Sequence, residues 1–159
     1  MSSTDLADAV PALKRAVAPP GRFAELFPTA TAIELTAYLM DGLAEAQLDR
    51  FLLDRIVDED GVVTEALTAA QVALVVIYSS TRILASEIRD RRSHIQYVAG
   101  PASFEEDQAA SVMVELLKQM DARKKELKLE EQRGGSADAF AMADLYLARV
   151  TGDPYLLGG

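Results

Sequence analysis

The residues that could do chemistry are few in this chain, and they form no catalytic or metal-binding pattern. The 159 residues include one histidine and no cysteine, which excludes disulfides, thiol catalysis and cysteine-ligated zinc. His94 follows Arg91 and Arg92, and a general base there would need an orienting acid and a nucleophile that no motif supplies. We therefore expect no enzyme, no catalytic residue, no metal site and no cofactor.

Two clusters of charge have simple structural interpretations. Asp58, Glu59 and Asp60 precede Gly61, but the spacing to Glu65 does not match a calcium loop, so a solvated turn is expected. A second cluster is basic, but acidic residues are interleaved with it and no glycine-rich phosphate loop precedes it. Ion pairs within or between subunits are the better interpretation. The basic residues are Arg82, Arg89, Arg91 and Arg92.

The net charge also argues against a conventional DNA-binding domain. Sixteen basic and 25 acidic residues give a formal charge of −9, whereas affinity for duplex DNA depends mainly on lysine and arginine contacts to phosphates. Half of the residues are hydrophobic, which is enough apolar surface for a folded chain. The length fits one domain.

The elements that must position these residues are helices. We predict an all-α fold, a small bundle of three to four main helices. Prolines at Pro11 and at Pro19-Pro20-Gly21 predict an irregular N-terminal arm over 1–28, with a short helical piece near Asp5–Val17. Capping boxes predict helix starts at Thr31 with Glu34, at Thr68 with Gln71 and at Ser103 with Glu106.

The first of these helices carries Ile33, Leu35, Leu39 and Leu43 at helical spacing. Gly42 lies inside it and favours a bend or a break there. After the acidic turn, Val62 and Val63 predict a short extended piece. The third main helix should end near Leu129.

The second main helix, from Thr68 to about Arg92, is apolar on nearly every side in its first half. Such a helix must be buried on every side, either in the centre of the fold or between subunits. The most apolar run, from Ala69 to Tyr78, is about half the length that spans a bilayer. We predict a subunit interface formed by Val72, Val75, Val76, Arg82 and Arg89.

Two further segments are candidates for contacts with other proteins. Ile95, Tyr97 and Val98 favour extended structure, and Gly100-Pro101 is a turn signal, so a hairpin-like loop is predicted between the second and third helices. The segment from Gln132 to Ser136 is predicted to be a flexible joint. The apolar tail beyond it either folds back onto its own core or docks on another protein as a helix in a groove. We divide the chain accordingly into a helical domain, 1–133, and a joint with a docking tail, 134–159.

The chain resembles the head-to-tail adaptor (connector) proteins of long-tailed bacteriophages, especially those of actinobacterial phages. The resemblance rests on the apolar helix at 68–78 that runs into Arg82, on the loop from Tyr97 to Glu105 with the charged helix after it, and on the turn at 58–63. It implies a ring of probably twelve copies beneath the portal protein. That ring lengthens the DNA channel and provides the docking surface for the next head-completion or stopper protein.

The resemblance also implies roles for particular residues. The portal-docking tail would comprise Phe140, Met142, Leu145, Tyr146, Tyr155, Leu156 and Leu157. The loop that faces the next ring or the channel would comprise Ile95, Tyr97, Val98 and Phe104. Double-stranded DNA would pass without sequence-specific binding, and no membrane would be involved. The protein would be made in the host cytoplasm and end in the virion.

Net acidity is compatible with a channel that lets DNA pass, because each phosphate contact would add affinity and slow its passage. We hypothesise that Glu105, Glu106 and Asp107 face the channel. The alternative function is a small intracellular helical regulator that binds a protein partner through an apolar C-terminal capture segment. A carboxylate-dependent enzyme is disfavoured, because the chain lacks the Glu-x-x-His motif of metal-binding bundles.

Overall fold

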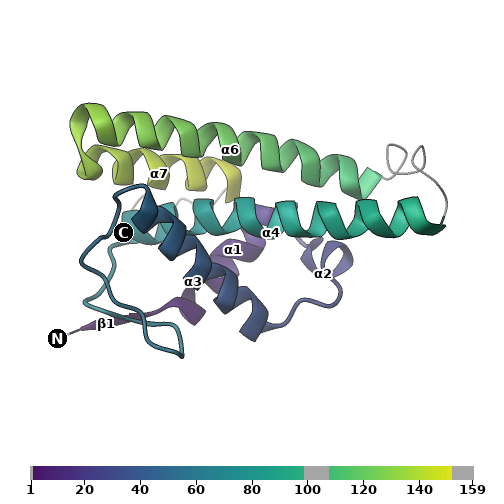
Figure 1. Cartoon of the computed structure of the whole chain (residues 1–159), viewed down its shortest axis with the longest axis horizontal. Coiled ribbons are helices and arrows are strands. Elements are labelled where there is room, and N and C mark those ends of the chain that lie inside the picture. Colours follow the sequence, from purple (N-terminus) through teal and green to yellow (C-terminus); the bar gives the residue numbers. More distant parts are fainter. Residues whose placement is uncertain (1, 99–107, 152–159) are drawn as a thin grey trace.

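Helix α4 (Ala69–Val98) runs through the middle of the protein, and the other main helices pack around it in a computed structural model of the chain (Figure 1). The structure describes the backbone of residues 2–98 and 108–151 and the side chains of 2–92 and 110–149. The predicted all-α bundle is confirmed. The other elements are β1 (Ser3–Asp5), η1 (Leu6–Ala9), α1 (Val10–Val17), α2 (Phe23–Leu26), α3 (Ala32–Leu48), β2 (Val62–Thr64), α6 (Gln108–Gly134) and α7 (Ser136–Thr151).

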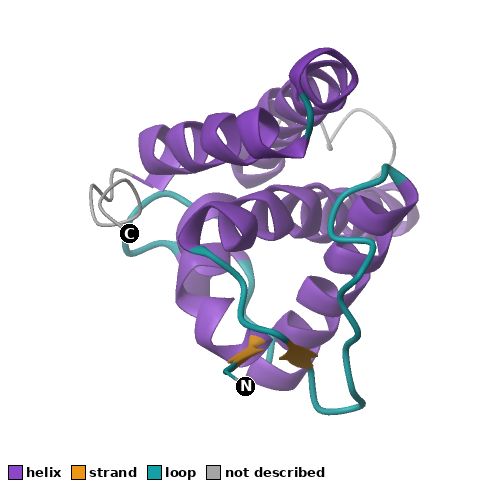
Figure 2. Ribbon diagram, turned by 90° about the vertical axis from the view of Figure 1, so that its left-hand side faces the viewer, coloured by secondary structure: helices purple, strands orange, loops and turns teal. Residues whose placement is uncertain are grey.

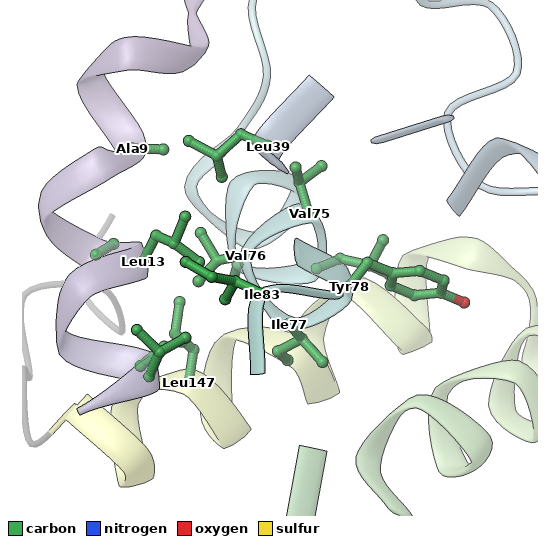
Figure 3. Close-up of a cluster of buried hydrophobic side chains, with 14 of the residues drawn as sticks. Ala9, Leu13, Leu39, Val75, Val76, Ile77, Tyr78, Ile83 and Leu147 are labelled. Atoms are coloured by element: carbon green, nitrogen blue, oxygen red, sulfur yellow. The ribbon is translucent and has the colours of Figure 1, made fainter. Parts of the chain in front are cut away.

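The first half of α4 is the core of the fold. From Ala73 to Thr81, every side chain is at most 5% exposed, as predicted for a helix that is apolar on all sides. Figure 3 shows side chains from α1, α3 and α7 converging on it, among them Leu13, Leu39 and Leu147. The buried hydroxyls of Ser79 and Ser80 donate to backbone carbonyls one turn earlier, both at 2.7 Å, so their burial leaves no polar atom unpaired.

By length and composition alone, part of α4 could cross a membrane. The stretch Ala69–Arg92 meets that test, but 61% of its apolar window is buried inside the protein. A helix enclosed by its own chain passes the same test as a membrane span, so its apolarity is explained by the core.

The N-terminal region is not the irregular arm that its prolines predicted. Pro11 lies in the first turn of α1, where a missing N–H costs no helical hydrogen bond. Leu6, Leu13 and Val17 are fully buried. Strand β1 pairs antiparallel with β2, with Thr4 opposite Val63, which confirms the predicted extended piece. These strands lie on the opposite side of the molecule from α6 and α7 (Figure 2).

Local capping fixes the starts of α3 and α4. The Glu34 N–H donates to Thr31 Oγ1 at 3.2 Å. Thr68 and Gln71 form a reciprocal box, with N–H to side-chain distances of 3.2 and 2.9 Å. The third predicted box, Ser103 with Glu106, lies outside the described residues. Helix α3 continues through Gly42 without the predicted break.

The predicted flexible joint is instead a tight turn between two helices. Helix α6 extends beyond Leu129 to Gly134, and α7 begins at Ser136. Only Gly135 lies between them, at φ +92°, a conformation that glycine adopts without strain. Because the turn is so short, α7 returns antiparallel along α6 and lies beside it (Figure 1).

Candidate interaction surfaces

The predicted docking tail begins with a helix that is packed on its own chain. Ala139, Ala143 and Leu147 on α7 are fully buried. The Phe140 ring lies 5.8 Å from the Phe51 ring, and Met142 packs against the core. This arrangement is the fold-back alternative that the sequence left open.

The outward side of α7 carries the tail residues that another protein could reach. Leu145 is 46% exposed. Tyr146 is partly exposed, its hydroxyl bonds to Glu126, and the Arg123 guanidinium lies 4.4 Å from its ring centre. Desolvation and the bond to Glu126 raise the pKa of Tyr146. Tyr155, Leu156 and Leu157 lie outside the described residues.

The predicted loop is helical over part of its length. Helix α4 continues through Ile95, Tyr97 and Val98, where their β-propensity predicted extended structure. A helix that is already nucleated adds one hydrogen bond for each residue, and β-propensity yields easily to context. Phe104 and the predicted channel acids Glu105, Glu106 and Asp107 lie outside the described residues.

The five predicted interface residues of α4 divide into two groups. Val75 and Val76 are fully buried within the chain itself, so a neighbouring subunit cannot reach them. Arg82 and Arg89 are exposed and Val72 is half-buried. The prediction is corrected to these three, because side chains of the same chain already cover the apolar middle of α4.

Arg82 belongs to a network of charges that joins α3, α4 and α6. Glu45 on α3 accepts a hydrogen bond from Arg82 at 3.2 Å and also pairs with Lys124 of α6. Directly after α3, the Oδ1 atom of Asp49 lies 3.4 Å from the Lys128 Nζ. Of the basic cluster on α4, Arg82 with Glu45 and Arg91 with Glu87 therefore form ion pairs within the subunit.

Tyr78 lies at the centre of this network. Its hydroxyl donates to Asp49 Oδ2 at 2.6 Å, and the Lys124 ammonium lies 4.8 Å from the centre of its ring. Burial of the phenol, followed by the hydrogen bond to Asp49, raises the pKa of Tyr78 far above its usual value. A neutral phenol that cannot ionise readily has a structural role here, because it fastens α4 to the end of α3.

The acidic turn at 58–60 is stabilised by hydrogen bonds from its own backbone to the Asp58 side chain. Asp58 Oδ1 accepts the N–H groups of Asp60 at 2.9 Å and Val62 at 3.0 Å, and Gly61 adopts φ +84°. Within the part of the chain that the structure describes, no group of three or more histidine or acidic side chains could hold a metal ion. The side chains of Asp58, Glu59 and Asp60 are exposed, as expected for a solvated turn.

A surface that the sequence did not single out runs along the outside of α3. Five apolar residues recur there at spacings of 4, 3, 4 and 4, with Ile33 and Leu48 at its ends, both 84% exposed. Ala37 and Ala44 are exposed and Met40 is half-buried. We call these five residues, Ile33, Ala37, Met40, Ala44 and Leu48, the outer stripe of α3.

The sequence pattern placed Ile33 in one helical series with Leu35, but the structure separates the two residues. Two residues along an α-helix correspond to about 200° of rotation, so Ile33 and Leu35 point to nearly opposite sides. Leu35 is 1% exposed, whereas Ile33 faces outward. The available signal was that α3 carries more apolar residues than one buried face can hold.

Part of the outer stripe lines a groove together with three acidic residues, which we call its acidic rim. The groove has a volume of about 480 Å³, and Ile33, Ala37 and Met40 are among its lining residues. Asp5 from β1 and Glu59 and Asp60 from the acidic turn also line it. A lining of apolar side chains and carboxylates suits a partner that is both apolar and basic.

Comparison of the chain with protein-family models, with curated proteins and with solved structures found no match.

Proposed function

We propose that this chain is a structural virion protein, a subunit of a head-to-tail adaptor ring that binds below a phage portal. The ring extends the DNA channel and offers a docking surface to the next head-completion protein. The protein acts by binding other proteins, without catalysis and without a cofactor.

The observation that carries the proposal is the amount of apolar surface left exposed around α3. Four large aliphatic side chains there, Ile33, Leu48, Leu53 and Ile56, are between 67% and 84% exposed. Single exposed aliphatic residues are common on monomers, but a row that follows one helix from end to end is typical of a protein-binding surface. A ring subunit needs surfaces of this kind for its neighbours.

The segments that resemble the adaptor proteins also have a suitable arrangement. They correspond to α4 and α6, which lie side by side and extend beyond the end of α7 (Figure 1). A long pair of helices offers one contact surface to a protein above the ring and another to a protein below it. The net charge of −9 is consistent with a channel wall that does not retain DNA.

The experiment that tests this function is assembly on a portal. The gene neighbourhood is examined first, because an adaptor gene is expected close to portal and capsid genes. The neighbouring portal protein is then purified, mixed with the full-length chain and imaged. We expect an added ring of density below the portal. If portal particles remain bare at saturating concentrations of the chain, the adaptor function is wrong.

The portal-docking tail requires a variant that keeps the fold. Ending the chain at Gly134 would remove α7 and uncover the core, so loss of binding would have two explanations. A chain that ends at Thr151 lacks Tyr155, Leu156 and Leu157 but keeps α7. Leu145→Asp changes the exposed side of α7. If both variants decorate portals as the full-length chain does, the portal contact lies elsewhere.

A further inference from the structure

We infer that the outer stripe of α3 in one copy docks against the outward face of α6 in a second copy, so that subunits associate head to tail. This inference rests on the proposed ring and names the two surfaces that would hold neighbouring subunits together. It follows from the spacing, exposure and charge of the two helices.

The α3 surface is apolar along its middle and acidic at both sides. Helix α3 contains Glu34, Asp41 and Glu45 and has no lysine, arginine or histidine. Glu34 and Asp41 are exposed beside the outer stripe. On the other side of the stripe lie the acidic rim residues of the groove, Asp5, Glu59 and Asp60. Glu45 is already paired with Arg82 and Lys124, so the remaining exposed carboxylates favour a basic occupant.

This charge excludes a symmetric contact between the outer stripes of two copies. In such a contact the same patch meets itself across a two-fold axis, so acidic flanks would face acidic flanks without compensation. Like charges brought together in an interface are unfavourable. The second copy must therefore offer a different face.

The outward face of α6 has the matching pattern. The exposed acids Glu115, Asp121 and Glu126 lie beside one row of five exposed residues. That row recurs at the same spacings of 4, 3, 4 and 4 as the stripe on α3. Three of the five are basic, and Leu129 is a large aliphatic side chain that is 49% exposed. We call this set, Lys118, Ala122, Lys125, Leu129 and Arg133, the outer row of α6.

Two helical rows with the same residue spacing can lie along each other over about four helical turns. Alanines at the second and fourth positions of the stripe, Ala37 and Ala44, allow the helix of the other copy to approach closely. At one end of the contact, Lys118 or Arg133 would lay its aliphatic stem on Ile33 and place its charge at the acidic rim. Which of the two reaches Ile33 depends on whether the helices run parallel or antiparallel.

One copy can offer both surfaces at the same time. Helices α3 and α6 are separate neighbours of α4, and the outer stripe and the outer row consist of different residues, so using one leaves the other free for a third copy. A contact between two different faces repeats from copy to copy, and it closes into a ring when the rotation between copies divides a full turn.

The absence of cysteine permits a direct test with single introduced cysteines. Three chains carry Ala37→Cys, Ala44→Cys or Ala122→Cys, and the Ala122→Cys chain is mixed in turn with each of the other two. In an antiparallel contact position 122 faces position 44, and in a parallel contact it faces position 37. We expect one of the two mixtures to give a disulfide-linked dimer at least ten times faster than the other.

Ala85→Cys, at an exposed position of α4, is the matched control and should react slowly with Ala122→Cys. Charge reversal adds a second measurement. Asp41→Lys in the α3 chain should slow the cross-link several-fold, and Lys125→Glu in the α6 chain should restore it. Rescue of this kind requires the two side chains to be close in the complex.

Three results would overturn the inference. One is equal rates: at millimolar protein, the Ala37→Cys and Ala44→Cys chains cross-link to Ala122→Cys no faster than the Ala85→Cys chain does. Another is dimerisation of the Ala37→Cys or Ala44→Cys chain with itself as the dominant product. The third is failure of Lys125→Glu to rescue Asp41→Lys. Ring density on the portal together with any of these keeps the adaptor function and rejects this interface. Fast cross-linking together with portals that stay bare keeps this interface and rejects the adaptor function.

Discussion

Gly42 of α3 lies directly against Ser79 of α4. A Cβ atom at Gly42 would be 2.0 Å from Ser79 Oγ and 2.8 Å from the Ser79 backbone nitrogen. Both residues are buried, and the Ser79 hydroxyl donates a hydrogen bond to the Val75 carbonyl at 2.7 Å. The absence of a side chain at position 42 is therefore what lets the two helices approach so closely.

Gly42→Ala should destabilise the fold. Helix propensity alone predicts a gain of about 1 kcal/mol for this change, but the added methyl group meets backbone atoms of α4, and overpacking of this kind costs about 1 to 3 kcal/mol. We expect a lower midpoint in urea unfolding followed by circular dichroism. Ala44→Gly on the exposed side of the same helix is the control and should cost about 1 kcal/mol by propensity alone. A Gly42→Ala chain more stable than the natural one would show that this contact is wrong.

Leu147→Ala tests whether α7 belongs to the core. Leu147 is fully buried, whereas Leu145, two residues away on the same helix, is 46% exposed. Truncating a buried leucine costs about 2 to 5 kcal/mol, and a surface change is usually within about 0.5 kcal/mol. Thermal unfolding of the two variants should differ accordingly. Equal stability of the Leu147→Ala and Leu145→Ala chains would mean that α7 is detached in solution.

Tyr78 predicts how stability responds to alkaline pH. Because burial and Asp49 raise its pKa in the folded state, the folded chain holds the phenolic proton after the unfolded chain has released it. The contribution is complete below about pH 10, the usual tyrosine pKa, and falls by about 1.4 kcal/mol per pH unit above it. Unfolding measured between pH 8 and 11 should show this loss.

The Tyr78→Phe chain should have a shallower alkaline loss of stability. At pH 7 it should be less stable by about 1 to 2 kcal/mol, because Asp49 loses a hydrogen-bond donor. Tyr146→Phe is the comparison, and its effect on the alkaline slope should be smaller because the Tyr146 side chain is more exposed. Identical pH profiles for the natural and Tyr78→Phe chains would contradict this role.

Lys124→Met tests the connection between α3 and α6. The change keeps the length and apolar stem of the side chain but removes its charge, which pairs with Glu45 and lies over the Tyr78 ring. The expected loss is about 1 to 2 kcal/mol, and it should shrink at high salt. Lys125→Met, on the exposed side of α6, should leave the unfolding midpoint nearly unchanged. A loss of the same size in both chains would rule out a specific bridge at Lys124.

Much of the helical framework could be predicted because its signals are local. The boxes at Thr31 and Thr68 begin α3 and α4 within one residue of the prediction, since a cap depends on residues three positions apart. The apolar run after Thr68 predicted a central helix because every side of it must avoid water. Helix ends were predicted less well where residues of high β-propensity compete with helix continuation. At Ile95 the sequence predicted extended structure, but α4 continues.

The sequence by itself determined the helical class, the caps, the buried middle of α4 and the lack of cysteine chemistry. Only the tertiary structure decided that α7 folds back on α4, that Val75 and Val76 face the inside of their own chain, and that α3 has a second, exposed apolar stripe. The physical reason is that hydrophobic attraction has no direction. An apolar pattern states how much surface must leave water, but only the packed neighbours decide whether this chain or a partner covers it.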